Sequence, residues 1–231
     1  MNLLAIETAT EACSVALLCH GEVRSRFEIA PRRHTELVLP WCEALLAEAG
    51  IAKSQLDAIA VGRGPGAFTG VRLAVALVQG MALALERPVL PVSTLAVLAQ
   101  GAQAAPGSRV LAAIDARMGE VYLGAFAVDG EGRVAALGDE VLCAPAQPPQ
   151  FEGQWLARGT GFAAVEGALC AALSGRLDAV DAGALPRADD LLALAAAAFA
   201  RGEAIAPDLL EPAYLRDKVA LSLAEQRAAR G

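Results

Sequence analysis

The stretch LLAIETATEACSVALLCHGEVRSRFEI, residues 3–29, decides the fold. Near-continuous apolar runs occupy residues 3–8 and 13–19, and a looser alternation of apolar and polar residues occupies 22–29. A polar break separates the first two runs, and His20-Gly21 forms a tight turn before the third. Runs of strand length joined by short turns predict an antiparallel meander of three strands.

Three helices and two further strands are expected after the meander. Residues 35–49 have helical spacing and stop at Gly50, a residue type favoured just after a helix. Residues 57–62 form an apolar strand that leads into the glycine-rich segment GRGPGAFTG, residues 62–70. A helix over 69–85, a strand over 88–92 and a helix over 94–103 complete the first half.

The second half repeats this order more weakly. The composition shifts at residues 103–108, QAAPGS, which suggests a boundary. Further strands are expected over 110–115, 120–128, 134–142 and 155–159, and helices over 162–173 and 189–200. The duplication predicts an α/β protein of two lobes with a cleft between them. We place residues 1–103 and about 205–231 in the first lobe and 104–204 in a smaller second lobe, with a frayed C-terminal end.

Composition restricts the function classes. The 231 residues carry a net charge of −7 and a pI near 4.9, whereas a protein that grips a nucleic-acid backbone needs a basic face. Nucleic acid would therefore be held by a partner. The five cysteines are odd in number and include no C-x-x-C pair, which favours buried thiols over a disulfide framework or a zinc site.

No membrane segment is expected. The start, MNLLAIE, has no basic region before its apolar run, unlike a signal peptide. The longest apolar stretch, residues 73–85, contains Gln79 and is shorter than the roughly 20 residues of a membrane span. We expect a soluble, cytoplasmic protein.

Two segments are candidate phosphate sites. The hydroxyls that follow the first strand can hold phosphate oxygens, and a glycine-rich loop before a helix brings backbone N–H groups close to an anion. The candidate residues are Thr8, Thr10, Gly62, Gly64, Gly66 and Thr69. Alternatively, the threonines satisfy local backbone groups and the loop is a turn with Thr69 as the N-cap. The loop lacks the G-K-[ST] ending of a Walker motif and the spacing of G-x-G-x-x-G.

Other catalytic machinery is scarce. The two histidines, His20 and His34, fall in a turn and just before a helix, and no zinc-protease or serine-hydrolase motif is present. Asp115 closes a strand without an evident charged companion. We therefore predict no catalytic residue and no metal ligand.

The helices over 35–49 and 69–85 are apolar over more than one face. Apolar residues cover an arc of roughly 200° on the first, whereas a helix packed on one core needs little more than about 100°. On the second, only Arg72 and Gln79 are polar beyond the first turn, seven residues apart on one stripe, and Ala76, Gly80 and Ala84 form a ridge of small residues. Such helices are buried on every side or meet another chain, and we favour a protein–protein interface. The predicted contacts are Leu37, Trp41, Leu45, Val71, Val75, Val78 and Ala82.

Several of these segments together resemble the bacterial TsaB (YeaZ-like) family. The residues that carry the resemblance are LLAIETA at 3–9, CSVAL at 13–17, HTE at 34–36, the block GRGPGAFTGVRLAVALVQGMALAL at 62–85, and PAYLR at 212–216. The resemblance implies an actin-like ATPase (ASKHA) fold, with an RNase-H-like mixed sheet in each lobe and a reduced second lobe. It also implies a role in making threonylcarbamoyladenosine next to the anticodon of tRNAs that read codons beginning with A.

The resemblance further implies partners. Family members work with a paralogous catalytic subunit, TsaD, and an ATPase, TsaE, pair with TsaD or with themselves through the two apolar helices, and reach tRNA only through the complex. The paralogue carries an H-x-x-x-H metal site whose histidine positions fall here on Thr94 and Leu98, neither of which binds metal.

We therefore expect a non-catalytic partner subunit, homodimeric when the partner is absent, with at most weak ATP or ADP binding at the cleft or at a subunit interface. A small-molecule kinase or nucleotide hydrolase on the same fold is the alternative, although the segment ETAT lacks the well-placed carboxylate that such enzymes have after the first strand. A peptidase is a third candidate, opposed by the lack of metal ligands and of a triad.

Overall fold

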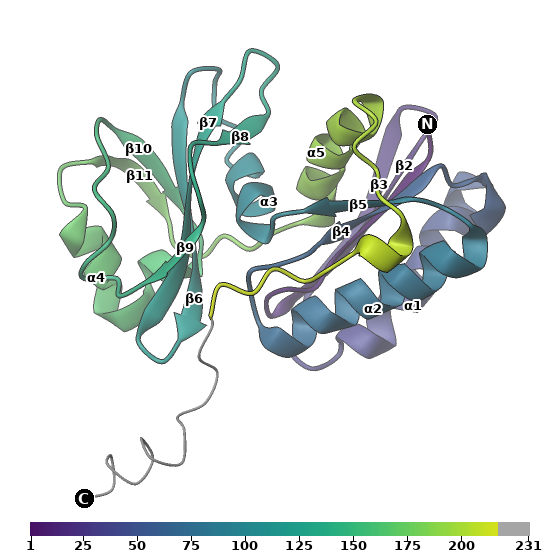
Figure 1. Cartoon of the computed structure of the whole chain (residues 1–231), viewed down its shortest axis with the longest axis horizontal. Helices are drawn as coiled ribbons and strands as arrows, with labels where there is room; N and C mark the ends of the chain where they lie inside the picture. The colour runs from purple at the N-terminus through teal and green to yellow at the C-terminus, as the bar shows by residue number, and fades with distance from the viewer. Residues whose placement is uncertain (217–231) are drawn as a thin grey trace, which may run out of the picture.

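The first lobe is built on a five-stranded sheet (Figure 1). The computed structural model describes residues 1–216. The strands are β1 (Leu3–Glu7), β2 (Ala12–Cys19), β3 (Glu22–Ile29), β4 (Ala58–Gly62) and β5 (Val89–Val92). Their order in the sheet is β3-β2-β1-β4-β5, with the meander antiparallel and β4 and β5 parallel to β1. The predicted meander is confirmed.

Helices cover both faces of this sheet because its central strands are apolar on both faces. In β1, Leu4 and Ile6 point toward α1 (His34–Ala49) and α2 (Phe68–Leu85), whereas Leu3 and Ala5 point toward α5 (Ala188–Ala200). This alternation follows from the two-residue period of a strand. A short 3₁₀ turn, η1 (Lys53–Gln55), leads from α1 into β4.

The second lobe repeats the topology of the first. Its strands are β6 (Arg109–Arg117), β7 (Glu120–Val128), β8 (Val134–Ala136), β9 (Val141–Cys143), β10 (Trp155–Arg158) and β11 (Leu177–Asp181). The order is β11-β10-β6-β7-β8, with β9 also paired to β7. The first sheet has the strand order 3-2-1-4-5, and the second sheet, read from β8, has the same order when β9 is left out of the count. The predicted actin-like ATPase fold with two RNase-H-like sheets is confirmed.

The second lobe is the smaller one, as expected. Between β9 and β10 the described chain forms a loop where the first lobe has α1. The helix predicted over 162–173 corresponds to α4 (Ala164–Ala172), which follows η2 (Thr160–Phe162) and is itself interrupted at Val165, Glu166 and Gly167, where φ is positive.

Three element predictions need correction. The strand expected over 134–142 is two short strands, β8 and β9, separated at residues 137–140. The helix expected over 94–103 is α3 (Thr94–Gln100), followed by turns. Strand β11 was missed, because its sequence LDAVD is an exposed edge whose side chains are mostly solvated.

The last helix of each half packs on the sheet of the other half. Helix α3 lies against β6, β7 and β8, and α5 lies against β1, β2, β4 and β5, so that the two helices contact each other between the lobes (Figure 1). The second lobe predicted over residues 104–204 includes α5, but the contacts of α5 are with the first sheet. Of the C-terminal segment assigned to the first lobe, residues 217–231 lie outside the described residues, as does the predicted frayed end.

Candidate functional site

The glycine-rich loop packs tightly on the exit of β1. A Cβ atom added to Gly66 would lie 2.3 Å from the Ala9 carbonyl oxygen, and one added to Gly70 would lie 2.0 Å from the Thr8 carbonyl oxygen. The Ala67 N–H donates to that Ala9 oxygen at 2.7 Å. The glycines of the loop therefore serve a close approach of two backbone segments of the same chain.

The side chains predicted to hold phosphate are bonded within the chain. The Thr8 hydroxyl donates to the Gly70 carbonyl oxygen at 2.8 Å, and the Thr10 hydroxyl accepts from the Ala12 N–H at 3.3 Å. Thr69 is exposed within the first turn of α2, and the residue at the N-cap position is Ala67. The local alternative, threonines that satisfy backbone groups, describes Thr8 and Thr10, and phosphate binding by these residues stays a prediction.

Glu7 occupies the centre of this arrangement. Its carboxylate accepts from the Ala9 N–H at 2.7 Å and from the Thr94 hydroxyl at 3.1 Å. A Cβ atom on Gly62 would lie 1.7 Å from one carboxylate oxygen, so glycine is required beside it. Burial raises the pKa of Glu7 from 4.5 to about 7, against the opposing effect of its hydrogen bonds.

Thr94 extends this network to the loop. Its hydroxyl accepts from the Gly64 N–H at 3.2 Å, and its own N–H donates to the Gly64 carbonyl oxygen at 2.9 Å. Thr94 and Leu98, the two positions aligned with the paralogue's histidines, are both buried. Thr94 joins β1, the glycine-rich loop and α3, whereas Leu98 packs in the core of the second lobe.

The corresponding loop of the second lobe also packs on the chain's own backbone, and we call both loops closed. Strand β10 takes the position of β4, and the residues after it include Gly159 and Gly161. Cβ atoms on these glycines would lie 2.3 Å from the Ala113 carbonyl oxygen and 2.6 Å from the Ala113 Cβ. Asp115 donates its N–H to the Thr160 hydroxyl at 3.1 Å and pairs its carboxylate with the exposed Arg117. In both lobes the loop after the fourth strand packs on the chain's own first strand.

His34 has a structural position. Its Nε2 lies 3.1 Å from the Thr10 carbonyl oxygen and 3.2 Å from the Ala12 carbonyl oxygen, where α1 begins. Since the hydroxyl of Thr8 holds the first turn of α2 at Gly70, both helices begin at the loop that follows β1.

Most of the predicted partner contacts face the core. Val75, Val78 and Ala82 of α2 are at most 6% exposed and pack in the core of the first lobe, as does Leu45 of α1, and Val71 is 2% exposed beside Gly64. They form the inner face of the helix pair, and the sequence did not indicate which apolar arc of α2 is free to meet a partner, so these contacts stay a prediction. Helix α2 is apolar on almost every side, and its periodicity does not say which apolar arc faces the sheet. Leu37 and Trp41 are half-buried at the edge of the same cluster.

The ridge of small residues lies on the outside instead. Ala76, Gly80 and Ala84 are exposed, and a Cβ atom on Gly80 would meet nothing within 4 Å. Phe68 and Leu83 on α2 are 50% and 60% exposed, and Leu39 on α1 is 43% exposed. We call these six residues the outer face. By length and composition α2, with a mean hydropathy of 1.7, could cross a membrane, but its inner face is part of the core of the first lobe.

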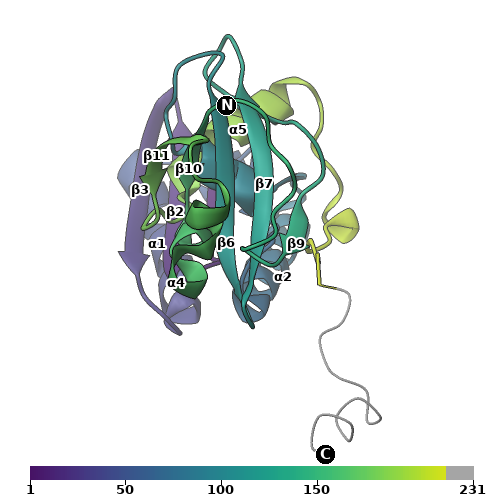
Figure 2. The same cartoon turned by 90° about the vertical axis from the view of Figure 1, so that its left-hand side faces the viewer.

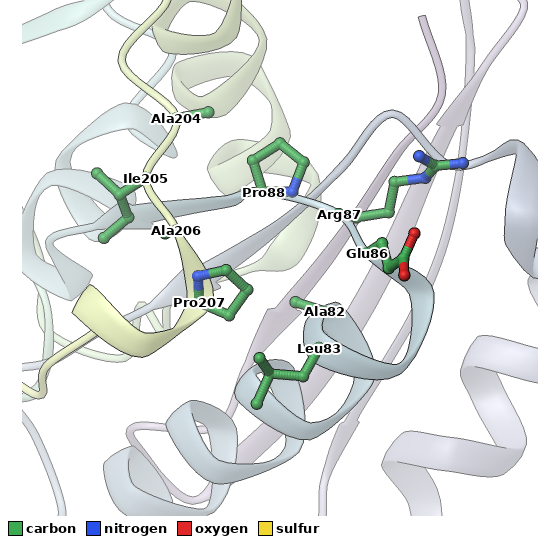
Figure 3. A pocket seen from close by; sticks show the side chains of 9 residues that line it. All are labelled: Ala82, Leu83, Glu86, Arg87, Pro88, Ala204, Ile205, Ala206 and Pro207. Carbon is green, nitrogen blue, oxygen red and sulfur yellow. The ribbon is translucent and has the colours of Figure 1, made fainter.

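Two hollows of the described chain lie away from the glycine-rich loop. The first, of about 470 Å³, lies at the C-terminal end of α2, between Leu83, Pro88 and the returning segment at Ile205 and Pro207 (Figure 3). Its lining is mostly apolar, and Leu83 joins it to the outer face. The second, of about 420 Å³, lies at the edge of the second sheet beside Arg109 and Asp178.

A comparison with known proteins first shows the class of protein to which this chain is similar. Residues 27–222 match the family model described as "TsaD: tRNA N6-adenosine threonylcarbamoyltransferase". Part of the chain is similar to such transferases: one from Pelodictyon phaeoclathratiforme is 38% identical over 108 residues, 40% of this chain and 31% of that protein. The match to the family model covers most of the chain and places it in this class.

Full-length relatives define the family more narrowly. The tRNA threonylcarbamoyladenosine biosynthesis protein TsaB of Escherichia coli is 44% identical over 227 residues, which is 95% of this chain and 96% of that protein. The TsaB of Haemophilus influenzae is 39% identical over 229 residues, with 95% of each chain covered. A solved structure of YeaZ from Pseudomonas aeruginosa is 48% identical, covers 93% of this chain and 99% of that one, and superposes with a TM-score of 0.84. The chain belongs to the TsaB family, which confirms the resemblance.

Proposed function

We propose that this chain is a non-catalytic partner subunit in the biosynthesis of threonylcarbamoyladenosine in tRNA. In this proposal it docks on the TsaD-type subunit that transfers the threonylcarbamoyl group to the adenosine adjacent to the anticodon, in tRNAs that read codons beginning with A. The observation that carries the proposal is the outer face: small and apolar side chains are exposed on a helix whose opposite side already forms the core. The names of the full-length relatives support the pathway.

The closed loops favour a non-catalytic role for this chain over a catalytic one. The Thr8 hydroxyl and the glycines that would approach a phosphate are occupied by the chain's own backbone. Glu7, the carboxylate nearest to them, is 1% exposed and bonded to Ala9 and Thr94. A kinase would need an open loop and an accessible carboxylate here. Another solved structure from Pseudomonas aeruginosa is described as that of a protein with similarity to the peptidase YeaZ. We propose no peptidase activity for the present chain.

We propose that the docking surface is the outer face of α2, and not the inner face that packs on the sheet. Small residues at Ala76, Gly80 and Ala84 let a second helix approach closely, and Leu83 and Phe68 provide apolar area at either end. Leu37 and Trp41 of α1 stay in the proposal as half-buried contacts at its border. A helix-on-helix contact of this kind fits a partner that presents the same pair of helices, either the TsaD-type paralogue or, in its absence, a second copy of this chain.

The remaining partners follow from charge and from the closed loops. With a net charge of −7 the chain is proposed to reach tRNA only through the complex, in the cytoplasm. A TsaE-like ATPase is proposed as the third member. Any weak ATP or ADP binding is proposed to need a subunit interface, since Gly66 and Gly70 of the loop pack on the backbone of residues 8 and 9.

The test is complementation in a bacterium depleted of its own TsaB. Ala76→Glu places a carboxylate on the outer face, and we expect it to lower threonylcarbamoyladenosine in tRNA, measured by mass spectrometry, by at least tenfold relative to the parent chain. Ala171→Glu is the matched control, since Ala171 is also an exposed helical alanine but lies on α4 of the second lobe. Equal modification by both variants, at equal protein levels, would count against the proposed surface.

A further inference from the structure

The segment after α5 returns along the first lobe and ends on the second. Residues 205–216, here called the strap, begin where Ile205 forms an antiparallel bridge with Val89 on the edge strand β5. A short 3₁₀ turn, η3 (Pro207–Leu209), lies beside α2, and the strap then crosses to the second lobe near the end of β6 (Figures 1 and 2).

The polar stripe of α2 binds the strap. The Gln79 side-chain amide donates to the carbonyl oxygens of Pro207 at 3.2 Å and Leu210 at 3.0 Å. Seven residues earlier, on the same side of the helix, Arg72 donates from Nε to the Tyr214 hydroxyl at 2.6 Å. The two polar residues of an otherwise apolar helix thus have one common partner, and Leu210 between them is buried.

Further contacts fix the strap at the glycine-rich loop. The Ala213 N–H donates to the Arg63 carbonyl oxygen at 2.8 Å. The Arg72 guanidinium lies 3.7 Å from the centre of the Phe68 ring, whose centre is 6.1 Å from that of Tyr214. These stacked groups hold the strap at the first turn of α2, two residues before it reaches the other lobe.

Arg216 makes the contact with the second lobe. One guanidinium nitrogen lies 2.8 Å from the Glu120 carboxylate, and the other donates to the Ala116 carbonyl oxygen at 3.0 Å. Ala116 and Glu120 flank the turn between β6 and β7. The Arg216 side chain is only 16% exposed, so this ion pair is partly withdrawn from water and is stronger than a surface pair.

We infer that the strap is a third connection between the lobes and that the contacts of Arg216 fix its end on the second lobe. The chain crosses between the lobes at only two other places in the described residues, from β5 into α3 and from β11 into α5. Two such crossings beside the packed pair α3 and α5 leave a rotation of one lobe against the other as the softest motion. The strap opposes this rotation, because it is held along α2 and grips the β6–β7 turn at its far end.

The test measures the orientation of the lobes in the intact chain. Spin labels are placed at Ala47→Cys on α1 and Ala171→Cys on α4, both exposed, after Cys143 and Cys170 are replaced by alanine; the other three cysteines are buried. Pulsed electron spin resonance then gives the distribution of distances between the lobes. We expect Arg216→Ala to broaden this distribution at least twofold, and Arg216→Lys, which keeps the charge but loses the two-pronged geometry, to broaden it less.

The controls separate the effect of the Arg216–Glu120 contact from a general effect of charge or folding. Arg117→Ala removes a neighbouring arginine that is 81% exposed, and we expect the parent distribution to be retained. Glu120→Ala removes the acceptor from the other side and is expected to broaden the distribution as Arg216→Ala does; it carries the test if Arg216→Ala does not fold. A distribution unchanged in the folded Arg216 and Glu120 variants overturns the inference, and so does equal broadening by Arg117→Ala.

Discussion

At the scale of single residues, Glu7 is the clearest case of a side chain fixed by its surroundings. It lies at the end of a wholly buried strand, against a glycine, with hydrogen bonds from Ala9 and Thr94. A carboxylate at the end of an apolar run, opposite a glycine-rich segment, was visible in the sequence. That it would be buried and bonded internally was not, because both features depend on residues far along the chain.

The raised pKa of Glu7 predicts a pH dependence of stability. Between pH 4.5 and about 7 the folded chain binds a proton that the unfolded chain has released, so the free energy of unfolding falls as pH rises through this window and stays low above it. The shift corresponds to on the order of 3 kcal/mol. Glu7→Gln, which keeps the shape and is always neutral, is expected to remove this fall, measured by urea unfolding at pH 5 and pH 8. Parallel pH profiles for the two proteins would contradict the assignment.

Two glycine substitutions are expected to have opposite effects. Gly70→Ala places a Cβ atom 2.0 Å from the Thr8 carbonyl oxygen, a backbone atom that cannot move aside, and should cost about 3 kcal/mol or more of unfolding free energy. Gly80→Ala meets nothing within 4 Å on an exposed helix face and should stabilise the chain by about 0.5–1 kcal/mol. Thermal unfolding of both variants measures the contrast, and a destabilised Gly80→Ala would show that this face is covered in the isolated chain.

At the scale of elements, α2 shows which features helical periodicity predicts and which it does not. The sequence indicated the helix, its unusual apolar arc, its polar stripe and its ridge of small residues. It did not reveal that the valine stripe faces the sheet and the ridge faces outward, because both stripes are apolar and only contacts with distant strands distinguish them. The polar residues Arg72 and Gln79 had no assigned role until the strap was seen to bind them.

The two faces of α2 predict different consequences of a new carboxylate. Val75→Asp buries a charge in the core of the first lobe and is expected to reduce the unfolding free energy by about 3 kcal/mol or more. Ala76→Glu, one residue later but exposed, is expected to change it by less than about 0.5 kcal/mol. Urea unfolding compares them directly; similar losses in both would mean that the two faces are wrongly assigned.

At the scale of the whole molecule, the repeated order of strands and helices predicted two lobes of one topology. The exchange of α3 and α5 between the sheets was not predictable, since a helix of Ala and Leu suits either sheet and the choice is made by long-range packing. The same limit hid the role of PAYLR at 212–216, which marks the family in sequence but acts in the structure by joining α2 to the β6–β7 turn.

The closed loops of both lobes predict the behaviour of the isolated chain toward nucleotides. Since Gly66 and Gly70 contact the backbone of residues 8 and 9, we expect calorimetry with Mg-ATP to show no binding tighter than about 1 mM and no turnover. Micromolar binding with hydrolysis would restore the alternative of a kinase or nucleotide hydrolase.

The central claim is that the exposed ridge of α2 docks the TsaD-type subunit, and one affinity measurement tests it most directly. The purified chain is titrated into the TsaD-type subunit of the same organism by calorimetry, with Ala76→Glu compared with the parent and with Ala171→Glu. The account predicts that Ala76→Glu weakens the complex at least a hundredfold while Ala171→Glu binds like the parent. Binding by Ala76→Glu with the parent's affinity would contradict it.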